Sequence, residues 1–189
     1  LKHHGIDVVL DRPAVGQNLQ DHLQVRVIHR CNQPLTTNDD MLSLWRKMRM
    51  GMQYVFQRSG PMAVGINQAG AFLRTRSEID RPDIQFHFLP IAIRYDGKAS
   101  ATSHSWQAHV GPMRSNSRGY VKIKGKNPNL NPEIVFNYMS CDEDWEDFRN
   151  CIRLTREIIN QPSLLKFISK EIRPGDKVNS DDEIDSFIR

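Results

Sequence analysis

Residues 15–28 read VGQNLQDHLQVRVI, a polar loop that leads into a segment of alternating character. From Leu23 onward, apolar and polar residues follow one another in turn. This period of two predicts a half-buried strand, because successive side chains of a strand point to opposite faces. His22 and Gln24 then share the more polar face of that strand.

Three further apolar segments have the length and the borders of strands. The run from Ile6 to Leu10 ends at an Asp-Arg-Pro turn and suits a buried strand. Residues 84–89 are closed by a proline, and residues 120–124 follow an Arg-Gly pair. The last two segments point to a mixed sheet.

Residues 41–57 carry apolar side chains at steps of three or four, which predicts an amphipathic helix that ends before the Ser-Gly-Pro sequence at 59–61. A methionine-rich stripe of this kind is usually part of a core. A flanking cluster of basic residues, 46–49, is interpreted as a solvated helix face.

Two segments, 140–143 and 180–183, have the S-x-x-E form of a capping box, in which a serine hydroxyl and a glutamate carboxylate satisfy free amide groups of a helix. The first box is expected to begin a helix with one apolar face, formed by Trp145, Phe148, Ile152 and Ile159. The second begins a helix that the end of the chain cuts after about two turns.

Composition places the chain among globular proteins of one-domain size, with 189 residues, 39% apolar and 25% charged. No run approaches the roughly 18 apolar residues that cross a bilayer. The three cysteines lack metal-ligand spacing, which predicts that they form no metal site. Because their number is also odd, they are expected to be reduced thiols in a cytoplasmic protein. The net charge of +4 comes from scattered basic residues, which argues against nucleic acid as a partner.

The loop at 15–22 resembles the VGxNLxDH segment of the glucose-methanol-choline (GMC) oxidoreductase family. Other family-like segments follow in the expected order, namely RPDIQFH at 81–87, MRSNSRG at 113–119 and NYMS at 137–140. Two more segments, QAHVG at 107–111 and RLTREI at 153–158, are similar to the bacterial choline dehydrogenase branch.

This resemblance implies an α+β fold, a mostly antiparallel sheet packed on one side by helices, with a short tail of an α/β flavin-binding domain at the N-terminus. Residues 1–22 would end the flavin-binding domain, and residues 23–189 would form the substrate-binding domain, truncated at its C-terminus. The chain does not begin with Met, and the family's G-x-G-x-x-G loop is absent. It is therefore expected to be an internal fragment that is inactive alone and contains no catalytic residue of its own.

The resemblance also implies an activity, the oxidation of choline to betaine aldehyde, or of a related primary alcohol, by hydride transfer to FAD. FAD is expected in the full-length protein and not in the fragment. Two alternatives stay open: a dehydrogenase of a non-cationic primary alcohol, and a stand-alone binding or oligomerisation module with the same fold. A homodimer, and a parent protein peripheral to the inner membrane, are further expectations.

His22 and Gln24 are the first site residues that the resemblance implies. The family's histidine at the end of NLxDH lies at the active site, and choline-specific members carry a glutamate two residues later, where this chain has Gln24. A neutral amide loses the charge-charge attraction to a trimethylammonium group, which puts choline in question. A structural, hydrogen-bonded histidine is the alternative for His22.

Three more residues are assigned to the substrate pocket: His87, Phe88 and Trp45. His87 matches a pocket histidine of the family, although its phenylalanine neighbours also suit a core histidine. Trp45 falls near an aromatic position of choline-oxidising relatives, with a core tryptophan as the alternative. Asn18 and Asp21 are assigned to the cofactor side, where they would fix the loop beside the flavin through backbone hydrogen bonds.

Overall fold

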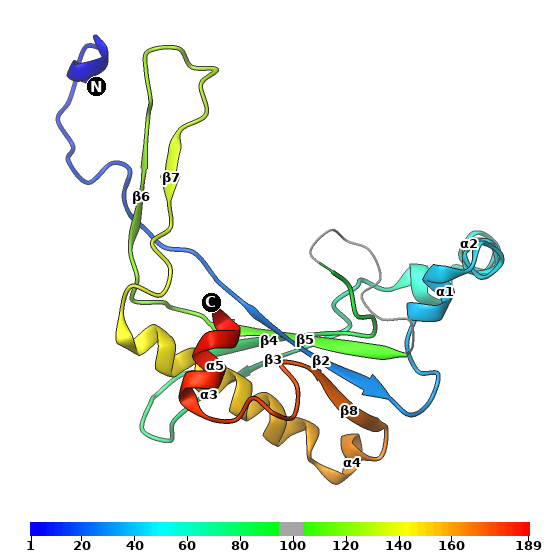
Figure 1. Cartoon of the computed structure of the whole chain (residues 1–189). Coiled ribbons are helices and arrows are strands. Elements are labelled where there is room, and N and C mark those ends of the chain that lie inside the picture. The colour runs from blue at the N-terminus through cyan, green and yellow to red at the C-terminus, as the bar shows by residue number, and fades with distance from the viewer. Residues whose placement is uncertain (95–103) are drawn as a thin grey trace.

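The computed structural model describes residues 1–94 and 104–189, which form two antiparallel sheets and five α-helices. The larger sheet has the strand order β3-β4-β5-β2-β8, with bounds Ala69–Leu73, Ile84–Leu89, Ser105–Pro112, Val25–Cys31 and Ile168–Arg173. The smaller sheet has the order β1-β6-β7, with bounds Gln17–Leu19, Gly119–Lys122 and Glu133–Val135. The α-helices are α1 Asn38–Leu42, α2 Leu44–Gln57, α3 Asp142–Ile159, α4 Pro162–Leu165 and α5 Asp181–Ile188 (Figure 1).

The large sheet is covered by helices on one face. Figure 1 shows α3, α4 and α5 on the same side of it, with α3 running across the strands. The core between these layers is apolar: Val27, Phe86 and Val110 from the sheet are fully buried, as is Ile152 from α3. This arrangement confirms the predicted α+β fold with helices on one side of the sheet.

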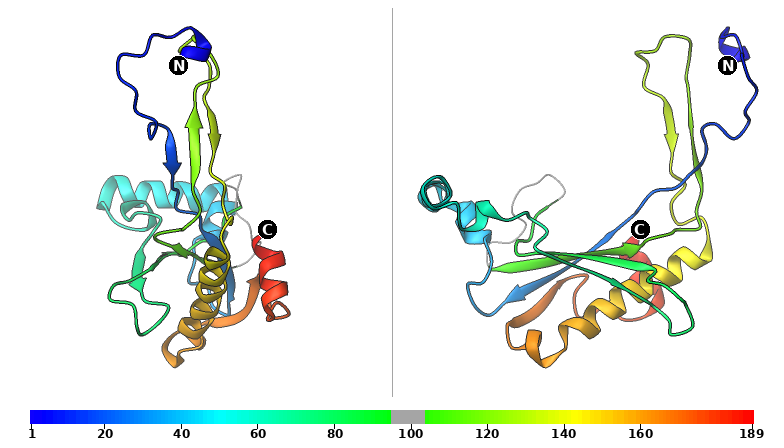
Figure 2. Two further views of the ribbon diagram at one scale, coloured as in Figure 1. Left: turned by 90° about the vertical axis from the view of Figure 1, so that its left-hand side faces the viewer. Right: turned by 180° about the vertical axis from the view of Figure 1, so that it is seen from behind.

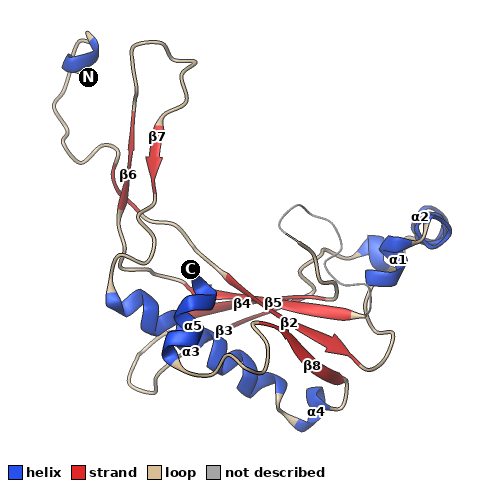
Figure 3. Cartoon of the chain, viewed as in Figure 1, coloured by secondary structure: helices blue, strands red, loops and turns tan. Residues whose placement is uncertain are grey.

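The small sheet forms an arm that rises from one end of the large sheet, and α1 and α2 rise from the other end on the same side (Figure 2). The secondary-structure colouring shows that the N-terminal segment runs beside this arm as loop after a short 3-10 helix at Lys2–His4 (Figure 3). Every strand pair in both sheets is antiparallel, so the mixed sheet expected from the strand segments is wrong.

The run Ile6–Leu10 is not a buried strand. It is loop, and Val9 is 99% exposed. No strand in the described part of the chain pairs with it. Without a neighbouring strand, the backbone N–H and C=O groups of this apolar run cannot form the hydrogen bonds of a sheet. The alternating segment after Leu23 does form a strand, which begins two residues later, at Val25.

The methionine-rich stripe of α2 faces outward, contrary to the core position expected for it. Six apolar side chains lie on one side of this helix and are all about half exposed or more: Leu44, Trp45, Met48, Met52, Val55 and Phe56. Helical periodicity defines which residues share a face, but it does not determine which face packs against the rest of the molecule.

Only one of the two capping boxes forms. Ser180 caps α5 as predicted, with Glu183 reaching back to the backbone of Ser180. At α3 the N-cap residue is Cys141, and Ser140 instead donates its hydroxyl to Ser117. The competing side-chain partner removed Ser140 from the helix end.

Candidate functional site

The face of the large sheet opposite α3 carries mostly polar side chains in the described part of the chain, together with Phe72 of β3, which lies opposite Gln85. Strand register sets His87 of β4 directly opposite His109 of β5, and His109 opposite Arg26 of β2. Because side chains alternate along a strand, these three groups point to the side away from Phe86 and Val110. We call this surface, formed by Arg26, Gln85, His87, Gln107 and His109, the polar face.

His109 is held neutral on the polar face. Burial, then Arg26 and His87, lower the pKa of its imidazole to about 4. Gln107 accepts the backbone N–H of Ile93 at 3.2 Å through its amide oxygen, which turns its NH₂ group toward the ring. The NH₂ group then donates to Nε2 of His109 at 2.8 Å, leaving the ring proton on Nδ1. A neutral imidazole in this tautomer can donate its Nδ1–H to the oxygen of a bound hydroxyl group.

One end of the polar face is covered by residues 91–94. Arg26 donates to the carbonyl oxygen of Ile93 at 3.3 Å, and Asn38 binds both backbone groups of Ala92. These contacts bury Gln107 completely while His109 stays partly accessible. The accessible part of the polar face therefore lies around His87, His109 and Gln24.

Gln24 lies beside the polar face because the backbone at Leu23 and Gln24 approaches the backbone of Gly111 closely. A Cβ atom built on Gly111 would lie 2.2 Å from the carbonyl oxygen of Leu23 and 3.2 Å from Cα of Gln24. Only glycine allows the chain before β2 to approach β5 so closely. Gln24 is half-buried beside Gly111, which in turn lies opposite Gln85 on β4.

His22 lies in the segment that joins the arm to the large sheet, with an exposed side chain. Neither His22 nor Gln24 belongs to a strand, because β2 begins at Val25, so the shared strand face expected for these two residues does not form. Gln24 alone lies beside the polar face. Asp21, next to His22, accepts a hydrogen bond from the hydroxyl group of Tyr138. That bond, followed by the backbone N–H of His22, lowers the pKa of the Asp21 carboxyl group.

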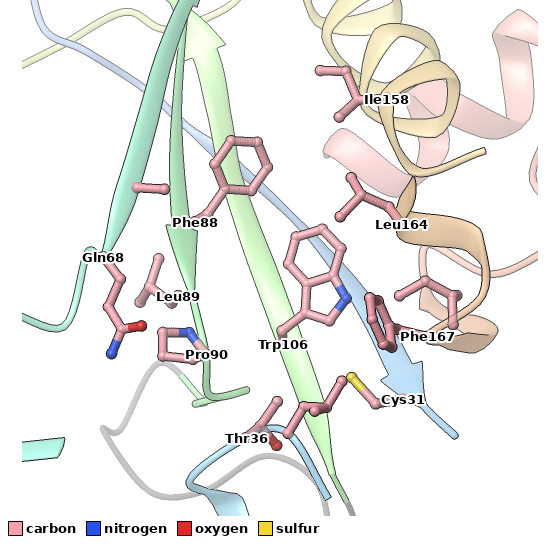
Figure 4. Close-up of a pocket in the computed structure, with 13 residues that line it drawn as sticks. Cys31, Thr36, Gln68, Phe88, Leu89, Pro90, Trp106, Ile158, Leu164 and Phe167 are labelled. Carbon is pink, nitrogen blue, oxygen red and sulfur yellow. The ribbon is translucent and has the colours of Figure 1, made fainter. Parts of the chain in front are cut away.

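Phe88 and Trp45 lie away from the polar face. Phe88 points to the helix-covered side, where its ring lies 5.9 Å from that of Trp106. Both rings line an apolar cavity of about 460 Å³ that also contains Phe167 and Cys31 (Figure 4). Trp45 is on the outer side of α2 and is 71% exposed.

Asn18 lies within β1 and is exposed, with a backbone φ of 59°. This left-handed conformation is one that asparagine tolerates better than most residues. Asn18 and Asp21 thus occupy the junction between arm and sheet, at the same end as His22.

Four polar-face residues were not among the sequence candidates: Arg26, Gln85, Gln107 and His109. The alternation of Gln107 and His109 along QAHVG was a usable signal, because positions two apart share a strand face. What the sequence did not contain was the register that brings His109 next to His87. In the described part of the chain, no cluster of His, Cys, Asp or Glu could hold a metal ion, the three cysteines are free, and no helix is long and apolar enough to cross a membrane.

Comparison with known proteins gives consistent matches. A family model described as GMC oxidoreductase matches residues 115–189. Over all 189 residues, the chain is 54% identical to an oxygen-dependent choline dehydrogenase of Brucella anthropi and 45% identical to one of Klebsiella pneumoniae. The chain belongs to the GMC oxidoreductase family. It spans about a third of the length of these curated relatives, 34% in both cases.

The solved structures similar to this GMC chain support the fold. A formate oxidase matches with a TM-score of 0.87 at 21% identity, over 99% of this chain and 37% of that one. The pyridoxine 4-oxidase from Mesorbium loti matches with a TM-score of 0.75 at 22% identity, over 99% of this chain and 33% of that one. The family resemblance predicted from the loop at 15–22 is confirmed.

Proposed function

We propose that the whole protein is an FAD-dependent oxidoreductase that acts on the CH–OH group of a primary alcohol, and that this chain supplies one wall of its alcohol site. The observation that carries the proposal is the polar face, where His87 and His109 are cross-strand neighbours on the side of the sheet without helices. Oxidases and dehydrogenases among the similar proteins support the reaction class by their names.

The proposal divides the chain as the sequence suggested, with residues 1–22 as the end of the flavin-binding domain and 23–189 as the substrate-binding domain. The change from the small sheet at β1 to the large sheet at β2 supports a boundary between these strands, and the pairing of β1 with β6 joins the two parts through the arm. The sequence has no G-x-G-x-x-G loop, so the described residues fit the border of a flavin site and not its pyrophosphate cradle. FAD, when bound, supplies the hydride acceptor.

Several residues of the candidate site have a proposed task. Asn18 and Asp21 would border the flavin at the junction of arm and sheet. Neutral His109 and its neighbour His87 would orient the alcohol by hydrogen bonds, and His22 would do so from the arm side. Phe88 and Trp45, which the family resemblance also assigned to the substrate pocket, have no task in this arrangement, because Phe88 faces the helix-covered side and Trp45 lies on the outer side of α2.

The substrate remains a choice between two classes. The names of the relatives favour choline. The polar face favours a non-cationic alcohol, because the described strand positions that face this side carry no Asp or Glu and Gln24 occupies the position of the family's carboxylate. A quaternary ammonium group is recognised through carboxylates and aromatic faces.

The test uses the full-length protein, purified with its bound flavin. We expect reduction of the flavin under anaerobic conditions by a primary alcohol, and a comparison of choline with its uncharged isostere, 3,3-dimethylbutan-1-ol, assigns the class. A full-length protein that binds no flavin, or whose flavin no primary alcohol reduces, refutes the proposed function. Homodimerisation, a cytoplasmic location and peripheral membrane contact stay predictions from sequence.

A further inference from the structure

The carboxylate of Asp21, next to His22, is hydrogen-bonded to Tyr138, which lies 117 positions after Asp21 in the chain. It accepts a hydrogen bond from the hydroxyl group of Tyr138, and it belongs to the residue directly before His22. We propose that Tyr138 is a positioning residue for His22 and acts on it through Asp21. This inference rests on the proposed function, because His22 belongs to the same alcohol site.

Tyr138 is itself held in place from several directions. Its ring stacks on that of Phe136, with centroids 4.9 Å apart and planes 6° from parallel. The residue before it, Asn137, donates to the carbonyl oxygen of Arg118 at 3.1 Å. The residue after it, Met139, accepts the indole N–H of Trp145 on α3 at 3.0 Å. Tyr138 therefore presents its hydroxyl group from a segment anchored to the main helix of the domain.

A second anchor holds the residue before Asp21. Gln20 donates its amide to the carbonyl oxygen of Ser115 at 2.6 Å. Ser115 is buried and donates its hydroxyl to Asp144 at 2.6 Å. Asp144 is 1% exposed and accepts further bonds from the backbone of Asn116 and Ser117. Burial raises the pKa of its carboxyl group, but the hydrogen bonds from the Ser115 and Ser117 side chains and from these backbone groups outweigh it and lower that pKa. The segment before His22 is thus tied to the N-terminal end of α3.

The residue after His22 is fixed as well, by the contact of Leu23 with Gly111 on β5. The backbone is therefore held on both sides of His22, while the His22 side chain stays exposed. Contacts that hold a backbone but leave its central side chain accessible fit a role in presenting that side chain.

The Tyr138 bond contributes little to stability by itself, because Asp21 is exposed and Tyr138 is 37% exposed, so water competes for their hydrogen-bonding groups. The arm contains a similar bond that does not touch the His22 segment. There Tyr120 donates to Glu133 at 2.5 Å, between β6 and β7. Tyr120→Phe is therefore a matched control for Tyr138→Phe.

The experiment compares both variants with the unmodified full-length flavoprotein, with flavin content and melting temperature measured for each. We expect Tyr138→Phe to lower kcat for the alcohol about tenfold and to change KM less than about twofold, since a misplaced group slows the chemical step more than it weakens binding. Hydrogen exchange should become about threefold faster in peptides that cover residues 20–24. Tyr120→Phe should change kcat less than about twofold and leave that exchange unaltered.

Three results overturn the proposal: an unchanged kcat in Tyr138→Phe, an unchanged exchange rate at residues 20–24, or an equal loss of kcat in Tyr120→Phe. If the unmodified protein oxidises no alcohol, the proposed function fails separately. The exchange measurement then decides whether Tyr138 orders the His22 segment.

Discussion

His109 shows how neighbouring residues determine the state of a single side chain. Its partners on the polar face, Gln107, His87 and Arg26, come from three different strands. Together with burial they keep the ring neutral, and this has a measurable consequence for stability.

The first prediction concerns pH and His109. In the unfolded chain the imidazole takes up a proton near its ordinary pKa of 6.5, whereas the folded chain does so only at about 4. The unfolded state therefore binds more protons between these values, and the free energy of unfolding falls as the pH is lowered through that window. We expect His109→Gln to remove this loss, so that urea unfolding shows a smaller drop in stability from about pH 7 to about pH 5.

Asp147 changes the free energy of unfolding with pH in the opposite direction, so the effect of His109 is read from the difference between wild type and His109→Gln. Burial, and then Asp83, raise the pKa of its carboxyl group to about 6, so the folded chain gains stability as the pH falls through the same window. The difference between wild type and His109→Gln cancels this contribution. An equal pH dependence of the two proteins would show that His109 titrates normally in the fold.

The second prediction concerns Gln24 and substrate charge. Gln24→Glu in the full-length flavoprotein would create a charge pair with a quaternary ammonium group, with a Coulomb energy of about 3 to 4 kcal/mol at about 4 to 5 Å and an effective dielectric constant of about 20. Desolvation opposes much of this, which leaves about 1 to 2 kcal/mol, or about 5-fold to 30-fold in affinity. We expect kcat/KM to rise for choline and not for its uncharged isostere.

Gln85→Glu is the control for this substitution, because it adds the same charge to the same face on the other side of β5. Its effect on choline should be smaller. Equal changes for both alcohols, or no change for either, would mean that Gln24 does not contact the substrate cation.

At the scale of elements, α3 organises the domain. One side of this helix packs its apolar residues on the large sheet, and its first turn holds Asp144, which fixes residues 115–117. A second group of contacts ties it to β8, where Arg156 donates to both carboxylate oxygens of Glu171 at 2.8 and 2.9 Å. The helix therefore connects the core, the arm junction and the edge strand.

The third prediction tests this role at Phe148, whose exposed fraction is 2%. Phe148→Ala should lower the free energy of unfolding by about 3 to 5 kcal/mol, because the lost burial is joined by the cost of a cavity. Phe56→Ala on α2 is the control: its ring is 81% exposed, and the change expected there is within about 0.5 kcal/mol. Urea unfolding of the 189-residue chain measures both, and similar losses would contradict the assigned core.

At the scale of the whole molecule, the polar face would form one wall of the proposed alcohol site, and no described segment of this chain forms the opposite wall. The helices lie on the far side of the large sheet, and the arm and α2 rise from its ends (Figures 1 and 2). The chain matches about a third of its relatives' length, so most of a flavin site of their kind would come from residues outside this sequence.

The fourth prediction follows from that geometry. The 189-residue chain, purified alone and mixed with FAD, should be colourless after gel filtration and should oxidise no primary alcohol. The reason is that it presents the polar face but no glycine-rich pyrophosphate loop. Absorbance at about 450 nm that elutes with the chain would contradict this expectation.

The sequence by itself determined many of the local elements, though not the loop at Ile6–Leu10 or the start of α3, and it determined the family. The apolar face of α3, the strand at 84–89, the cap at Ser180 and the GMC motifs could all be predicted, because each depends on neighbours within a few residues. Only the tertiary structure decided which faces are covered and which side chains meet. Strand register between distant segments placed His87 beside His109. Phe88 faces the opposite side because successive side chains of β4 alternate, and the tertiary structure decided that this side is the one that the helices cover. Periodicity likewise identified the apolar side of α2, while the packing of whole elements left that side exposed.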